Sequence, residues 1–151
     1  MSHGQAVKVE FHSGVAEPLD HTCRLLRKAH AAGARVVVHG PGALLNQLDQ
    51  ALWTFDALSF VAHVRLRAGA LPSAQQARTP TWLVDDAAAV PAREVLLNLG
   101  PAMVEGWEDF ARVIEIVSAD PDDADAGRRR WRHYGERPGI ERVHHVRAAA
   151  S

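Results

Sequence analysis

Cysteine is nearly absent from this sequence, because Cys23 is the only one among 151 residues. A single thiol excludes an internal disulfide and any zinc site that uses several thiolates as ligands. Long hydrophobic runs are also missing, since no apolar stretch is longer than a short β-strand and no charged-then-apolar leader opens the chain. We therefore expect a cytoplasmic protein that neither spans nor binds a membrane.

The sequence also lacks an excess of either positive or negative charge. The chain has 17 lysine and arginine residues against 18 aspartate and glutamate residues, a formal net charge of −1 at pH 7 with histidine neutral. Proteins that coat nucleic acid rely on an attractive field from most of their surface. A nearly neutral chain argues against that class, so any site for an anion must be local.

Strand-like and helical patterns alternate along the chain. The strand-like apolar runs cover residues 7–12, 35–40, 59–64, 81–84, 95–99, 113–117 and 139–146. Helical patterns cover residues 19–33, 41–53, 106–111 and 120–137. This order predicts a single three-layer, Rossmann-like α/β domain over residues 1–151, with a mostly parallel central sheet and helices on both faces. Residues 1–5 and 148–151 are expected to be flexible ends.

A glycine-containing turn joins a predicted buried strand to a predicted helix. Gly40, Pro41 and Gly42 stand where a doubly wound fold holds a phosphate. The turn lacks the third glycine of a dinucleotide fingerprint and the Gly-Lys-Ser/Thr of a P-loop. A tight strand-to-helix connection explains the glycines without a ligand, and a small nucleotide-binding protein is a weaker alternative.

The histidines and the cysteine do not form a pattern typical of a catalytic or metal site. His21 and His30 are nine residues apart, which places them on opposite faces of a helix. His144 and His145 are adjacent in a predicted strand and so point apart. Cys23 occupies an apolar helical position with no histidine at helical spacing beside it. We therefore expect no metal, no cofactor and no catalytic residues.

An arginine-rich helix is the most unusual segment. Residues 127–137, GRRRWRHYGER, hold five arginines and two large aromatics, and Asp120 is expected to cap the helix that carries them. Arg128, Trp131 and Arg132 stand at i, i+3 and i+4, an arrangement that could bind a carboxylate together with an apolar side chain. The alternatives are a solvated arginine face and direct binding of single-stranded nucleic acid, with Trp131 stacked on a base.

A cluster of aromatic residues follows the second helical pattern. Trp53 lies about 130° from the centre of the leucine stripe on this helix, at 100° per residue. It is followed by Phe55 and Phe60. Trp53 is therefore either covered by the next loop or exposed as part of a partner interface.

Four segments resemble, in order and spacing, the chi subunit family of the bacterial DNA polymerase III holoenzyme. They are LDQALWTFDALSFVAH, EVLLNLG, ARVIEIV and GRRRWRHYGERPGIE, and the resemblance covers most of the chain. Two positions depart from the family pattern. Ala124 stands where some relatives have a lysine, and Ala62 replaces a proline that usually follows the phenylalanine two residues before it.

The resemblance implies a non-catalytic replication adaptor of the clamp-loader complex, located in the cytoplasm at the replisome. Such an adaptor joins the small psi subunit to the acidic C-terminal tail of single-stranded DNA-binding protein and reaches DNA mainly indirectly. The residues that the resemblance assigns to the tail site are Val117, Arg128, Trp131 and Arg132. Those that it assigns to the surface for psi or another partner are Trp53, Phe55 and Phe60.

Overall fold

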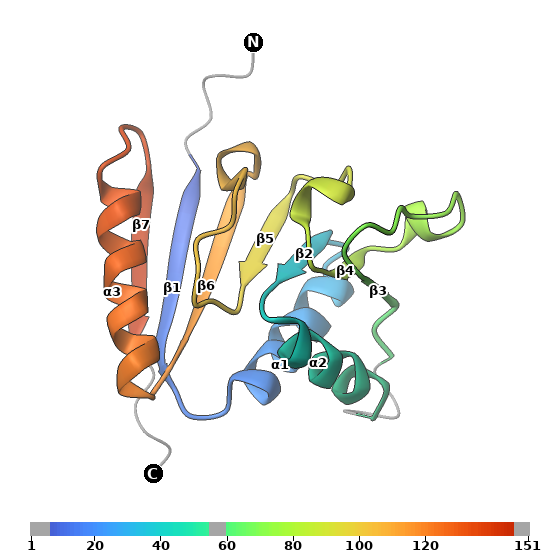
Figure 1. Ribbon diagram of the computed structural model, residues 1–151, viewed down its shortest axis with the longest axis horizontal. Helices are drawn as coiled ribbons and strands as arrows, with labels where there is room; N and C mark the ends of the chain where they lie inside the picture. The colour runs from blue at the N-terminus through green and yellow to red at the C-terminus, as the bar shows by residue number, and fades with distance from the viewer. Residues whose placement is uncertain (1–6, 55–59, 147–151) are drawn as a thin grey trace.

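The computed structural model describes residues 7–54 and 60–146, which form an α/β domain around one parallel sheet (Figure 1). The strands are β1 (Lys8–Val15), β2 (Val36–His39), β3 (His63–Leu66), β4 (Thr81–Val84), β5 (Val95–Asn98), β6 (Arg112–Ser118) and β7 (Glu141–Val146). The long helices are α1 (Pro18–Ala31), α2 (Gly42–Thr54) and α3 (Pro121–Gly135). Three short 3-10 turns are η1 (Gln76–Arg78), η2 (Ala87–Ala89) and η3 (Trp107–Asp109).

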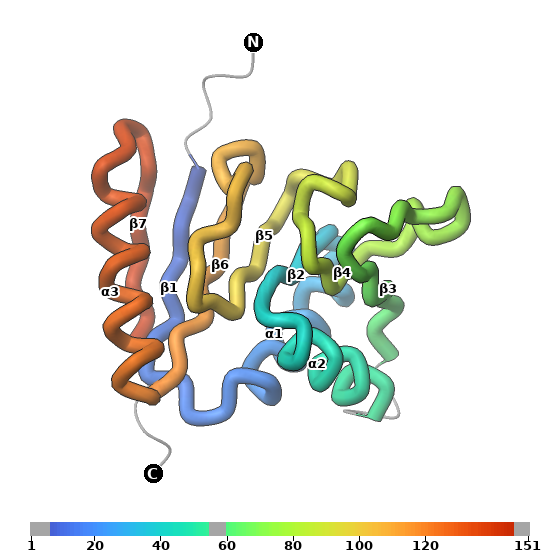
Figure 2. The backbone as a smooth tube through the Cα atoms, in the orientation of Figure 1, coloured from blue at the N-terminus to red at the C-terminus, as the bar shows by residue number. Residues whose placement is uncertain are grey.

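The strand order is β3-β4-β2-β5-β6-β1-β7, and every neighbouring pair is parallel. This confirms the predicted α/β class. Figure 2 shows β1, from the start of the chain, between β6 and β7, from its end. The strands β3 and β7 are therefore the two edges of the sheet.

Helices cover both faces of the sheet, as predicted. Alternate residues of β6 illustrate this: Ile114 and Ile116 belong to the core layer that contains Cys23 and Leu26 of α1. Val117 belongs to the opposite layer, which contains Tyr134 of α3. The residues that the structure describes include no helix with the length and hydrophobicity needed to span a bilayer.

Two predicted elements are shorter than expected. The helix expected over residues 106–111 is only the 3-10 turn η3, whose side chain Trp107 is buried against Tyr134 of α3. The strand expected over residues 59–64 begins at His63. Burial of two aromatic side chains, Trp107 and Phe110, fixes the first segment, whereas a helix would need further turns to bury an apolar face. The expected flexible ends, residues 1–5 and 148–151, lie outside the described residues.

A buried ion pair attaches α3 to the sheet. Glu115 of β6 is fully buried, and its Oε1 lies 2.9 Å from Nε of Arg130, which is also buried. Tyr134 donates a 2.6 Å hydrogen bond to Oε2, and Asn98 of β5 donates to the same carboxylate. Burial raises the pKa of Glu115, while the charge of Arg130 and these hydrogen bonds act in the opposite direction.

Replacement of Arg130 by methionine should destabilise the protein by about 3–5 kcal/mol, because it leaves the Glu115 carboxylate buried without its cation. Arg129 is the matched control, since it is the adjacent exposed arginine of the same helix. Arg129→Met should change stability by less than about 0.5 kcal/mol. Urea unfolding followed by circular dichroism measures both, and equal losses in the two variants would contradict this role for the ion pair.

Candidate functional site

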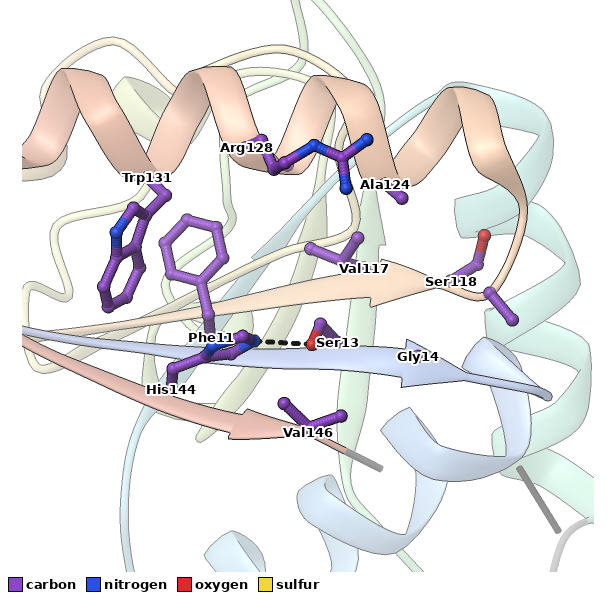
Figure 3. A pocket seen from close by; sticks show the side chains of 12 residues that line it. Phe11, Ser13, Gly14, Val117, Ser118, Ala124, Arg128, Trp131, His144 and Val146 are labelled. Atoms are coloured by element: carbon purple, nitrogen blue, oxygen red, sulfur yellow. Dashed lines mark hydrogen bonds between the residues drawn. The ribbon is translucent and has the colours of Figure 1, made fainter. Parts of the chain in front are cut away.

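A groove of about 480 Å³ lies between α3 and the strands β1, β6 and β7 (Figure 3). We call it the α3 groove. One wall is formed by α3, through Ala124, Gly127, Arg128 and Trp131. The floor is formed by side chains that the three strands direct toward α3. The groove therefore lies at the β7 edge of the sheet, on the face that α3 covers.

Gly127 allows α3 to lie close to the sheet beside this groove. A Cβ atom at this position would be 2.9 Å from both Cγ atoms of Val117 on β6, a distance that packed side chains do not tolerate. The helix backbone can therefore rest directly on Val117. The space that forms the groove opens on the β1 and β7 side of this contact.

Trp131 forms the apolar end of the groove and is held from several sides. Its ring lies 5.2 Å from the ring of Phe11 in an edge-to-face arrangement and 5.6 Å from the ring of His144. The guanidinium of Arg142 lies 4.5 Å from the centre of the indole and donates a 3.0 Å hydrogen bond to the Trp131 carbonyl. Trp131 is thus fixed in place while one part of its surface faces the groove.

His144 forms part of the β7 side of the groove and is itself hydrogen-bonded. Its Nε2 lies 2.6 Å from Oγ of Ser13 on β1, an interaction drawn as a dashed line in Figure 3. Ser13 and His144 both line the groove. The Ser13 hydroxyl and the His144 imidazole therefore place polar groups in a floor that also contains the apolar side chains of Phe11 and Val146.

Arg128 supplies the positive charge at the rim. Its side chain is 64% exposed and pairs with Asp125, one helical turn earlier, which is 57% exposed. Solvent-exposed ion pairs contribute little free energy because water screens both charges. A carboxylate arriving from solution can therefore replace Asp125 as the partner of Arg128 at low cost.

The structure brings together three of the four residues expected at the tail site. Val117, Arg128 and Trp131 line the α3 groove. Arg132 is exposed and is not among the residues that line it. The difference arises because Arg132 is about 100° around the helix from Trp131, so only Arg128 lies close enough to the groove.

Trp53 and Phe60 form a separate exposed aromatic surface. The two side chains are 59% and 55% exposed, and their ring centres are 5.4 Å apart. The ring of His63 lies 5.0 Å from Trp53 and is fixed by hydrogen bonds with Asp49 and the Val61 carbonyl. Trp53 is therefore an exposed side chain. Phe55, the third residue expected here, lies outside the described residues.

Several residues of the α3 groove were not expected from the sequence. They come from β1 and β7, which become neighbours only when the sheet forms, and they are Phe11, Ser13, His144 and Val146. The alternating pattern of residues 7–12 indicates which of their side chains share a face, but not which helix covers that face. The close contact between Gly127 and Val117 was also not expected, because glycine has no side chain and so does not contribute to a hydrophobic pattern.

Side chains of the protein lie beside the turn at Gly40 and Gly42. A Cβ at Gly40 would be 2.9 Å from Cβ of Leu99. Gly42 lies beside the guanidinium of Arg65, which pairs with Asp85 at 2.9 Å. Close packing thus accounts for Gly40 without a ligand, whereas a Cβ at Gly42 would make only ordinary contacts.

Comparison with known proteins gives two consistent matches. The family model described as "DNA polymerase III chi subunit, HolC" matches residues 7–140. DNA polymerase III subunit chi of Pseudomonas aeruginosa is 30% identical over 119 residues, which cover 78% of this chain and 79% of that protein. The range matched by the family model contains β1 to β6 and the whole of α3.

Substitution of Gly127 by alanine should have opposite effects in two backgrounds. In the natural chain the added methyl group meets Val117, and overpacking of this kind costs about 1–3 kcal/mol. In a Val117→Ala background the methyl group has room, and the better helix propensity of alanine should add about 0.5–1 kcal/mol of stability. Urea unfolding of the four proteins in this cycle measures both effects; the same sign in both backgrounds would contradict the close helix–strand contact.

Proposed function

The chain belongs to the family of DNA polymerase III chi subunits, and from this premise we propose that it is a non-catalytic adaptor that bridges two replication proteins. Membership in this family supports an accessory role in DNA replication. In the proposed role, one surface binds the acidic C-terminal tail of single-stranded DNA-binding protein. A second surface binds the psi subunit of the clamp loader.

The α3 groove has the chemistry that a peptide C-terminus requires. Arg128 at the rim offers a planar guanidinium, which pairs with carboxylates through parallel hydrogen bonds. Phe11, Val117 and Trp131 offer apolar surface for the last side chains of the peptide. A volume of about 480 Å³ lies within the range of binding pockets for small organic groups. This combination of one cation and an apolar floor is the observation that carries the proposal.

The position of Ala124 makes Arg128 the main cation of the groove. Some members of the family have a lysine here, whereas this chain has a small apolar side chain at the groove wall. Arg129 cannot substitute for it, because Arg129 lines a different surface beside Met103 and His133. We therefore expect tail binding in this protein to depend strongly on Arg128.

Direct binding of nucleic acid through the arginine run is the weaker alternative. A basic patch for a phosphate backbone needs several cations on one surface. Here Arg130 is buried against Glu115, and Arg128 and Arg129 line different surfaces of α3. The run of arginines in the sequence is therefore divided around the helix, which favours a peptide ligand over a strand of DNA.

The surface formed by Trp53 and Phe60 is the proposed site for psi. Large exposed aromatic residues are typical of the centres of protein interfaces. This surface adjoins β3, one edge of the sheet, whereas the α3 groove lies at β7, the other edge. Two partners bound at opposite edges would not compete for space, as an adaptor requires.

Removal of the Arg128 charge should weaken binding of the tail peptide. A charge-assisted hydrogen bond contributes roughly 1.5–3 kcal/mol, so Arg128→Ala should lower the affinity about ten- to hundredfold. Fluorescence polarisation with a labelled peptide copying the last ten or so residues of the host single-stranded DNA-binding protein measures this. Arg129→Ala, the neighbouring exposed arginine outside the groove, should bind like the unmodified protein.

The same assay separates the two candidate ligands. A tail peptide with an amidated C-terminus should bind more weakly than the natural one, because the amide carries no charge to pair with Arg128. Ala124→Lys should strengthen binding, since it adds a cation to the groove wall. Unlabelled single-stranded oligonucleotide should not compete with the peptide; competition that decreases steeply with salt would instead support the DNA-binding alternative.

Substitution of Trp53 should affect only the second partner. Trp53→Ala should weaken binding of psi at least tenfold, because truncation of a central aromatic commonly costs about 2 kcal/mol or more. Leu71→Ala is the control, since Leu71 is an exposed apolar side chain with 82% exposure. Isothermal titration measures psi binding, and tail affinity should be unchanged in both variants. Loss of tail binding in Trp53→Ala would contradict two separate surfaces.

A further inference from the structure

A cluster of potential metal ligands lies on the sheet face opposite the α3 groove. Glu10 and His12 are two residues apart in β1 and so point to the same side, and His145 of β7 pairs with His12 in the parallel register. One ligand atom from each of Glu10, His12 and His145 lies within 4.8 Å of the others. The intervening residues face α3, and of these His144 and Phe11 line the groove.

The three side chains are oriented by further contacts. The Glu10 carboxylate accepts a hydrogen bond from Arg112 through Oε2, while its Oε1 lies 3.9 Å from Nε2 of His145. Nδ1 of His12 lies 2.9 Å from Nε2 of His21 on α1. Metal-binding carboxylates and imidazoles are held in this way by a second hydrogen bond that fixes their direction. In this way Arg112 orients the Glu10 carboxylate and His21 orients the His12 imidazole.

We propose that Glu10, His12 and His145 bind a divalent transition-metal ion that links β7 to β1, with His21 as a positioning residue for His12. Two imidazoles and one carboxylate suit zinc, nickel or copper, whereas magnesium and calcium prefer oxygen ligands alone. The two β1 ligands are buried and His145 is half-exposed, so an ion can reach the site from the β7 side.

The distances fit such an ion after a small adjustment. Ligand atoms on a tetrahedral zinc ion are about 3.3 Å apart when each bond is 2.0–2.1 Å long. The ligand atoms here all lie within 4.8 Å of one another. The separation of 3.9 Å between Glu10 Oε1 and His145 Nε2 can be shortened by rotation of the exposed His145 side chain.

The expected consequence is a firmer attachment of an edge strand. Among the described elements, β7 pairs only with β1, and five of its six residues are exposed. An ion bonded to both strands would reduce local opening of β7. The sequence does not indicate this site, because His12 and His145 are far apart in the chain and become neighbours only in the sheet.

Zinc titration of the untagged protein by isothermal calorimetry tests the site. The unmodified chain should bind about one equivalent, His145→Ala should bind at least about tenfold more weakly, and His144→Ala should bind as the unmodified chain does. His144 is a matched control because it is the next residue along β7 and faces the opposite side. Absence of a stoichiometric site, equal losses in both variants, or unchanged affinity in His145→Ala would overturn the proposal.

Hydrogen exchange tests the link between the strands. Zinc should slow exchange of the β7 amides in the unmodified chain and not in His145→Ala, and magnesium should have no effect. His21→Ala should lower zinc affinity about ten- to hundredfold while leaving some binding, as expected of a residue that holds a ligand. Zinc binding that leaves β7 exchange unchanged would overturn the proposed link.

Discussion

The carboxylate of Glu115 is held away from water, and the orientation of α3 follows from the groups that compensate for this burial. Among the described residues Arg130 is the one that supplies a positive charge to it, and Tyr134, one turn later, supplies a hydrogen bond. These two contacts fix the rotation of the helix about its axis. At about 100° per residue, Arg128 and Trp131 must then face the groove side, and Arg129 must face the other side. The arrangement of the groove is therefore a consequence of a buried interaction that does not touch any ligand.

Local patterns predicted the elements well, because period and capping depend on near neighbours. Asp120 caps α3 as expected, accepting a 2.8 Å hydrogen bond from the Asp122 backbone. The three long helices and the parallel sheet follow from the order of apolar runs. Strand order could not be predicted in the same way, since it depends on which strands exchange hydrogen bonds across the whole chain. The helix predicted over residues 106–111 is only a short turn, because the spacing of its two buried aromatics, Trp107 and Phe110, gives the same local signal as a helix.

Part of the candidate site could likewise be predicted from local patterns, and part of it could not. Helical spacing indicated Arg128, Trp131 and Arg132, and the resemblance to the chi family added Val117. Of these four, Arg132 does not line the groove. Contributions from β1 and β7 were not visible, because residues more than 120 positions apart become neighbours only in the folded sheet. Trp53 was predicted to lie off the buried face of its helix, and its exposure agrees with that geometry.

The pairing of β1 also has a consequence for synthesis on the ribosome. Both partners of this first strand come from the last third of the chain, since Lys8 pairs with Arg112 and with Glu141. The strands β2, β3, β4 and β5, in contrast, pair among themselves before β6 is made. At about 5–20 residues per second, β1 waits on the order of 5–20 s with both edges unpaired. Half of the sheet can thus form during translation, and the half that carries the α3 groove can form only near its end.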